Sequence, residues 1–221
     1  VGGGGKEKPV IQAIDLSKSY GEQSLFTGLT FTVPLRSRIA LIARNGTGKS
    51  TLMDILAGVD TPDSGEVVRR NDITVGYLPQ TPAIDPSLSV MEAACRHDAT
   101  KARIVCRYEE ALASGDEASI AETTHMMDDS GSWGFESRIK EVLSRLKLDD
   151  TAKSVSVLSG GELKRLALAM LLVQEPDVML LDEPTNHLDL DMVEWLEEYL
   201  CKCGKTIFMV THDRYFLDRV A

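Results

Sequence analysis

The chain has 221 residues, of which 43% are hydrophobic and 26% are charged, a balance typical of a soluble globular domain. This composition excludes wholesale disorder and a fibrous repeat, and no apolar run approaches the roughly 18 residues that a membrane-spanning helix needs. With 24 basic and 34 acidic residues the net charge is −10, so an overall positive surface for nucleic acid is excluded. The four cysteines are expected to be reduced thiols, which indicates a cytoplasmic compartment.

Residues 1–9 are predicted to be a flexible, glycine-rich leader, and residues 10–221 to form one domain. Short apolar or alternating runs predict strands, whereas longer amphipathic runs predict helices. The predicted strands are 10–16, 25–33, 39–43, 75–78, 178–181 and 206–210, with turn residues over 60–65. Helices are predicted at 52–57, 162–174, 190–200 and 214–220.

The middle of the chain differs in character from both ends. Helix-forming residues dominate from 89 to about 148, with breaks near Ser114-Gly115 and over 128–134. The sequence therefore predicts an α/β core into which a helical subdomain, about residues 84–158, is inserted.

The strongest chemical signal is a glycine-rich loop between a predicted buried strand and a helix. Such a loop points successive backbone N–H groups at a phosphate chain, while a lysine reaches the β- and γ-phosphates and a hydroxyl binds Mg²⁺. The residues are Gly46, Thr47, Gly48, Lys49 and Ser50. The general pattern has glycine at position 43, where this chain has Ala43, and alanine there costs about 1 kcal/mol only if its φ is positive. The alternative is a chance Gly-Lys-Ser turn.

Two further motifs bear on the same chemistry. A buried run ends in Asp182 and Glu183, which suit Mg²⁺ binding and proton abstraction from water, although acidic strand ends are common. Ser159, Gly160 and Gly161 open a helix whose N-terminus suits an anion. As an isolated pentapeptide, Leu158 to Glu162 is more simply explained as a helix-capping box, Ser159 with Glu162.

Taken in chain order, these motifs resemble those of an ATP-binding cassette domain. Residues 46–51, 158–162, 177–184 and 211–213 look like its Walker A, signature, Walker B and switch-histidine motifs. Tyr20 stands in the place of its aromatic A-loop residue and Gln80 in that of its Q-loop. The resemblance covers roughly residues 10–220. It implies a P-loop NTPase fold with a mixed sheet core, an antiparallel β subdomain and an inserted helical subdomain.

The segments 184–189 and 212–218 are similar to the ABC-F subfamily, and 133–143 to its Uup-like branch. ABC-F proteins carry two cassettes joined by a helical linker, lack membrane domains and act at the ribosome. The chain resembles only the first cassette, so we expect it to be a fragment of a longer protein.

The resemblance also implies a role for each matching residue, with ATP and Mg²⁺ as cofactors. Nucleotide would be held by Tyr20 at adenine, by Asn45, Gly46, Thr47, Gly48 and Lys49 at the β-phosphate, and by Thr51 at the α-phosphate. Mg²⁺ would be held by Ser50, Gln80 and Asp182. Hydrolysis would use Glu183 as general base, His212 at the γ-phosphate and the water, and Gln80.

In the family, two cassettes sandwich two ATP molecules, and the signature completes the opposing site. The resemblance thus implies that Ser159, Gly160 and Gly161 contact ATP bound by a second cassette, in cis or in a homodimer, and that hydrolysis needs this pairing. The alternative functions are the nucleotide-binding subunit of a membrane transporter and a module that holds ATP without turnover, for which Ala43 is the only support.

The helical insert matches the place of an arm that reaches the ribosome in ABC-F proteins. Four basic residues in it would contact RNA phosphates: Arg96, Lys101, Arg103 and Arg107. The simpler interpretation, which we favour, is a solvated helix face whose neighbouring carboxylates compensate the charge.

Overall fold

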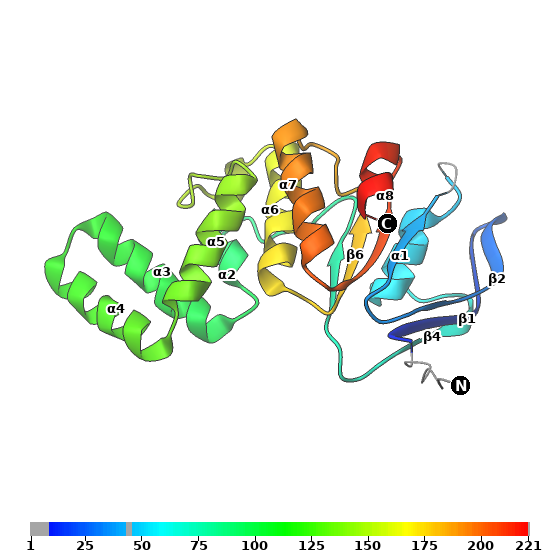
Figure 1. Cartoon of the computed structure of the whole chain (residues 1–221), viewed down its shortest axis with the longest axis horizontal. Helices are drawn as coiled ribbons and strands as arrows, with labels where there is room; N and C mark the ends of the chain where they lie inside the picture. Colours follow the sequence, from blue (N-terminus) through cyan, green and yellow to red (C-terminus); the bar gives the residue numbers. More distant parts are fainter. Residues whose placement is uncertain (1–8, 43–45, 221) are drawn as a thin grey trace, which may run out of the picture. The chain divides into compact units, whose positions relative to one another are not determined.

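The computed structural model describes residues 9–42 and 46–220. Residues 1–8 of the predicted leader, together with Ala43 and Asn45, lie outside the described residues. The chain divides into two compact units (Figure 1). The first unit is discontinuous and joins the segment that ends at Gln80 to the segment that begins at Glu175, and the second is Thr81–Gln174.

The described residues of the first unit form two sheets. The antiparallel sheet has the order β2-β1-β4, and the parallel sheet has the order β3-β7-β6-β5. Their strands are β1 (Ile11–Tyr20), β2 (Gln23–Val33), β3 (Arg38–Leu41), β4 (Ser64–Arg69), β5 (Val75–Leu78), β6 (Val178–Asp182) and β7 (Thr206–Val210). Strands β5 and β6 pair in parallel, with Val75 opposite Val178. Residues that precede the second unit in the chain and residues that follow it therefore belong to the same sheet.

In the part of the first unit that the structure describes, three helices accompany the sheets: α1 (Lys49–Ala57), α7 (Leu190–Lys202) and α8 (Arg214–Val220). One face of α1 is buried against β1, β6 and β7 in a single apolar core. The rings of Phe31 and Phe208 stack with centroids 5.8 Å apart and thereby connect β2 to β7. Every residue of β6 and β7 is buried, as expected for central parallel strands.

The second unit is helical. Its elements are α2 (Val90–Cys95), α3 (Ala99–Ser114), α4 (Glu117–Ser130), α5 (Trp133–Arg145), the 3₁₀ turn η1 (Val155–Val157) and α6 (Gly160–Gln174). Helices α3 and α4 lie side by side as an antiparallel hairpin (Figure 1). Gly115 and Gly131 end these helices with positive φ, which accounts for the two breaks predicted from the sequence. The predicted helical subdomain, 84–158, lies within this unit, which continues through α6.

The structure has the predicted α/β class, with both parallel and antiparallel strands. Several predicted boundaries need correction. Strand β1 continues to Tyr20 instead of ending at residue 16, because it pairs with β2 as far as Gln23, and helix α1 begins at Lys49 instead of at residue 52, directly after Gly48. Strand β4 begins at Ser64, inside the run 60–65 that was expected to form only a turn, because its backbone completes the antiparallel sheet beside β1. Helix α6 begins at Gly160, two residues before its predicted start, because the capping residue is Ser159.

Candidate functional site

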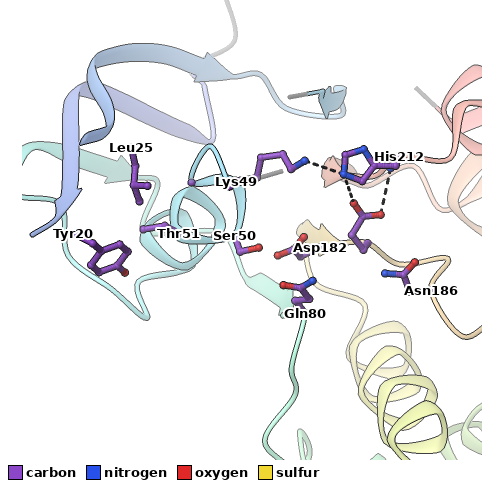
Figure 2. A pocket seen from close by; sticks show the side chains of 12 residues that line it. Tyr20, Leu25, Lys49, Ser50, Thr51, Gln80, Asp182, Asn186 and His212 are labelled. Atoms are coloured by element: carbon purple, nitrogen blue, oxygen red, sulfur yellow. Dashed lines mark hydrogen bonds and ion pairs between the residues drawn. The ribbon is translucent and has the colours of Figure 1, made fainter. Parts of the chain in front are cut away.

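One pocket of about 530 Å³ in the first unit gathers most of the predicted site residues (Figure 2). The ends of β1, β5 and β6, the start of α1 and the segment after β7 all contribute to its lining. The lining residues are Tyr20, Leu25, Gly46, Gly48, Lys49, Ser50, Thr51, Gln80, Asp182, Glu183, Asn186 and His212. Thr47 lies between two of these in the chain. Leu25 and Asn186 were not predicted as site residues.

The glycine loop needs glycine for two separate reasons. Gly46 and Gly48 have φ of 78° and 83°, a region that other L-residues rarely adopt. A Cβ at Gly48 would also lie 2.9 Å from the Cβ of Leu25 on β2. Gly48 directly precedes α1, so the helix N-terminus, with its partial positive charge, lies at the pocket. The loop is therefore built to hold an anion.

Asp182 ends the buried strand β6 and is only 3% exposed. Its Oδ2 has no hydrogen-bond partner among the described residues, and the Ser50 side chain lies beside it in the same pocket (Figure 2). Burial raises the pKa of Asp182, and the neighbouring Ser50 hydroxyl opposes that shift. A divalent cation would satisfy the unpartnered oxygen, and oxygen ligands are those that Mg²⁺ prefers. The pair Ser50 and Asp182 thus fits a magnesium ion.

Few protein ligands surround this position. Within residues 9–42 and 46–220, no group of three or more His, Cys, Asp or Glu side chains is arranged to hold a metal alone. Mg²⁺ usually binds through one or two protein ligands, with phosphate oxygens and waters completing its octahedron.

Glu183, His212 and Lys49 form a chain of contacts (Figure 2). The Nε2 atom of His212 lies 2.9 Å from Lys49 Nζ and 3.3 Å from Glu183 Oε1. The His212 backbone N–H donates to Glu183 Oε2 at 3.3 Å. The segment after β7 therefore holds the carboxylate at the end of β6. The sequence placed these residues in one site but did not predict that they contact one another.

The backbone of Glu183 has a positive φ of 51°. For a residue with a side chain this conformation costs about 1–3 kcal/mol and is found preferentially at functional sites. Its N–H still donates to Val210 O at 2.8 Å, so the strand pairing with β7 continues through the strained residue. The sharp turn directs the carboxylate towards His212, where it can accept a proton.

Tyr20 ends β1 at the edge of the pocket and its side chain is largely exposed, as expected for a ring available for stacking. Gln80 follows β5 and lines the same pocket, and Thr51 lies in the first turn of α1. Tyr20, Gln80 and Thr51 are thus brought together with the glycine loop.

The signature residues belong to the second unit. They are Ser159, Gly160 and Gly161, at the start of α6. Ser159 forms the capping box: its Oγ accepts from the Glu162 N–H at 3.2 Å, and the Glu162 carboxylate accepts from the Ser159 N–H at 2.8 Å. Glu162 also pairs with Lys153 Nζ at 2.7 Å, and this contact lowers the pKa of Glu162 to about 2.

The depressed pKa of Glu162 makes the stability of the chain sensitive to acid. A carboxyl group with a lowered folded-state pKa stabilises the fold above its ordinary value of 4.5, and this contribution is lost as the pH falls towards about 2. We expect Glu162→Gln to unfold at lower urea concentration than the original chain at pH 7 and to converge with it near pH 2. The exposed Glu141→Gln on α5 is the control, and a difference that persisted unchanged at pH 2 would contradict this origin.

Two of the four basic residues that were considered for RNA contact have partners within the second unit, among the residues that the structure describes. Arg107 Nη2 lies 3.6 Å from Glu122 Oε1, and Lys101 Nζ lies 5.9 Å from the centroid of the Phe135 ring. Arg96 and Arg103 are exposed. The contacts of Arg107 and Lys101 agree with a solvated, charge-compensated helix face.

Comparison with known proteins places these features in a family. The family model described as ABC transporter matches residues 26–186. YfmR of Bacillus subtilis, named an uncharacterized ABC transporter ATP-binding protein, is 38% identical over 219 residues, covering 96% of this chain and 35% of YfmR. The energy-dependent translational throttle protein EttA of Haemophilus influenzae is 38% identical over 197 residues, covering 84% of this chain and 35% of EttA. The chain thus spans about a third of these relatives' length.

Solved structures give the same fold. An ATP-binding subunit of an ABC transporter superposes with a TM-score of 0.70 at 23% identity, covering 96% of this chain and 83% of that subunit. The archaeal ribosome recycling factor aABCE1, solved with the ribosomal stalk protein aP1, superposes with a TM-score of 0.67 at 25% identity, covering all of this chain and 38% of that one.

Proposed function

Because this chain belongs to the ABC transporter family and has EttA, an ABC-F protein, among its relatives, we propose that it is the ATP-binding and hydrolysing cassette of an ABC-F type protein acting on the ribosome. The observation that carries the proposal is one pocket in which an anion-binding glycine loop, an unpartnered Asp182 oxygen and the Glu183–His212 pair converge.

Each side of the pocket suits one part of MgATP. The N–H groups of the loop and of the first turn of α1 bind the phosphates, with Lys49 near the γ-phosphate and Thr51 near the α-phosphate. Tyr20 stacks on adenine. Ser50, Asp182 and Gln80 hold Mg²⁺, which neutralises phosphate charge when bound. Glu183 accepts the proton of the attacking water, and His212 orients that water and the γ-phosphate.

Hydrolysis in this proposal requires a second cassette. Ser159, Gly160 and Gly161 resemble the signature motif, which in the family completes the opposing site, so their proposed nucleotide is the one held by a partner. The partner is the second cassette of the full-length protein or a second copy of this chain. Closure of the two cassettes would assemble each complete site only when ATP is bound.

The ribosome as the target is supported by relatives. EttA is named as a translational throttle, and the aABCE1 structure is of a ribosome recycling factor with a stalk protein. A cytoplasmic location follows from this proposal. Among the residues that the structure describes, no helix is both long and apolar enough to cross a membrane.

Co-sedimentation with ribosomes tests the proposal. Full-length protein carrying Glu183→Gln, with the matching change in its second cassette, is expected to pellet with ribosomes in ATP and to remain in the supernatant in ADP. Because Glu183→Gln is designed to retain ATP, it traps the closed state. Adding Lys49→Ala and its second-cassette equivalent to the same protein is the control and should abolish pelleting. Absence of pelleting despite ATP-dependent closure of the cassettes would instead favour the nucleotide-binding subunit of a membrane transporter.

A further inference from the structure

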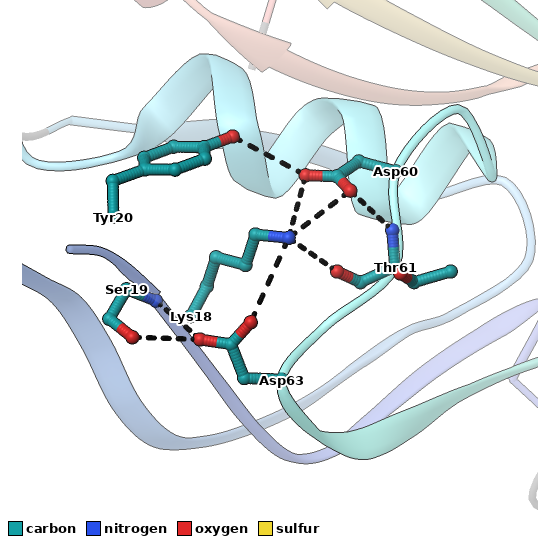
Figure 3. A network of polar contacts seen from close by, with 6 residues as sticks. All are labelled: Lys18, Ser19, Tyr20, Asp60, Thr61 and Asp63. Atoms are coloured by element: carbon teal, nitrogen blue, oxygen red, sulfur yellow. Dashed lines mark hydrogen bonds and ion pairs between the residues drawn. The ribbon is translucent and has the colours of Figure 1, made fainter.

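Five residues near Tyr20 form a polar network that no predicted motif explains (Figure 3). Its centre is Lys18, two residues before Tyr20 on β1 and only 9% exposed. The other members lie beside it on β1 or in the loop between α1 and β4. We call Lys18, Ser19, Asp60, Thr61 and Asp63 the Lys18 cluster.

Lys18 satisfies its ammonium group entirely within the cluster. Its Nζ lies 2.9 Å from Asp60 Oδ2, 3.1 Å from Asp60 Oδ1, 2.7 Å from Thr61 O and 3.9 Å from Asp63 Oδ1. Hydrogen bonding to Asp60 raises the pKa of Lys18, and the same bond lowers that of Asp60. Lys18 is therefore charged throughout the physiological pH range and holds the loop after α1 against β1.

The carboxylate of Asp63 is held by Ser19 as well as by Lys18. Asp63 Oδ2 accepts hydrogen bonds from the Ser19 N–H at 2.7 Å and the Ser19 hydroxyl at 2.8 Å. The backbone N–H of Thr61 donates to Asp60 Oδ1 at 2.7 Å. Each member is held by at least two contacts, so the position of the Lys18 ammonium is well defined.

This network extends to the Tyr20 ring in two ways. Lys18 Nζ lies 5.6 Å from the ring centroid, within the range of a cation–π contact. The Tyr20 hydroxyl donates to Asp60 Oδ2 at 3.4 Å (Figure 3). Since Tyr20 is 58% exposed, apolar packing restricts its rotamers little. The ammonium and the carboxylate act on different parts of the same ring and together select one orientation.

We propose that Lys18 is a positioning residue for base recognition, holding the Tyr20 ring ready to stack on the base of a nucleoside triphosphate. This inference rests on the proposed function, because it concerns the base end of the same pocket. A ring already held in its binding orientation loses less conformational freedom when a base stacks on it. Lys18 therefore increases the contribution of the base to the binding affinity and leaves the contribution of the phosphates unchanged.

Binding of two ligands separates these contributions. We expect Lys18→Met to weaken binding of MgATP roughly two- to fivefold, the range of an exposed cation–π contact, and to leave binding of inorganic triphosphate with Mg²⁺ unchanged. In a Tyr20→Ala background, Lys18→Met should have no further effect on MgATP. Lys18→Arg, which keeps the cation, should restore most of the affinity. Isothermal titration calorimetry measures all of these constants.

Arg70→Met is the matched control. It also removes a cation that pairs with an aspartate, Asp72, but Arg70 lines a different pocket, so neither affinity should change. If Lys18→Met does not fold, Asp60→Asn takes its place, since it keeps Lys18 but weakens both contacts to the ring.

Equal weakening of MgATP and inorganic triphosphate by Lys18→Met would overturn the inference, because the cluster would then act only on the fold. An undiminished effect of Lys18→Met in the Tyr20→Ala background would also overturn it. Failure of the unaltered chain to bind either ligand would instead remove the proposed function, and this inference with it.

Discussion

Replacing Glu183 by glutamine is expected to lower ATP turnover by about 10²- to 10⁴-fold while leaving ATP affinity unchanged. The amide has the size of the carboxylate, and its oxygen can still accept from the His212 N–H. It cannot accept a proton from water, so only the chemical step suffers. Turnover by phosphate release and affinity by calorimetry separate the two effects.

The same variant also tests pairing of the cassettes. When ATP binds without being hydrolysed, the paired state of the cassettes should accumulate. We expect to see it as an ATP-dependent decrease in elution volume in size-exclusion chromatography. Glu198→Gln is the control, since Glu198 pairs with Lys202 on the exposed face of α7. Unchanged turnover in Glu183→Gln would remove this residue from the role of general base.

Lys49→Ala is expected to weaken ATP binding by one to two orders of magnitude, because a hydrogen bond to a charged group contributes about 1.5–3 kcal/mol. Lys49→Ala removes the contact of Lys49 with His212 as well as the proposed contact with phosphate. The measured loss is thus the net of these two effects. Fluorescence titration with a labelled ATP analogue, supported by calorimetry, measures it.

Two further substitutions make the Lys49 result specific. Lys202→Ala removes an exposed ammonium on α7 and should leave ATP affinity unchanged. Lys49→Arg keeps the positive charge but replaces a compact ammonium with a planar group, so it should restore binding only in part. ATP affinity that is the same in Lys49→Ala and the original chain would contradict direct phosphate binding by Lys49.

The sequence predicted the elements that have a strong hydrophobic pattern. Strands β6 and β7 are continuous buried runs, and α7 has a clear amphipathic repeat, so their positions were predicted closely. Strand β4 has no such pattern, since most of its residues are exposed and it begins with Ser64 and Gly65. Its pairing with β1 is a long-range interaction that local pattern does not encode. The predicted resemblance to an ABC-F cassette is confirmed by the 38% sequence identity with EttA over 197 residues.

Prediction of the site had a similar limit. Residues within short motifs, such as Gly48 and Asp182, were identified because their chemistry depends on neighbours in sequence. The Lys49–His212 contact and the Lys18–Asp60 pair join residues far apart in the chain, and neither was predicted. The one local signal for Lys18 was its position two residues before Tyr20, which places both side chains on the same side of a strand.

The parallel pairing of β5 with β6 also affects how the protein is made. The chain emerges N-terminal end first at about 5–20 residues per second, so the glycine loop exists well before Asp182, Glu183 and His212. Strand β6 pairs with β5 only after the whole of Thr81–Gln174 has been synthesised, and a compact helical unit lowers the entropy lost on closing that loop. Folding of the helical unit therefore favours assembly of the pocket, whose lining is complete only when synthesis has passed His212.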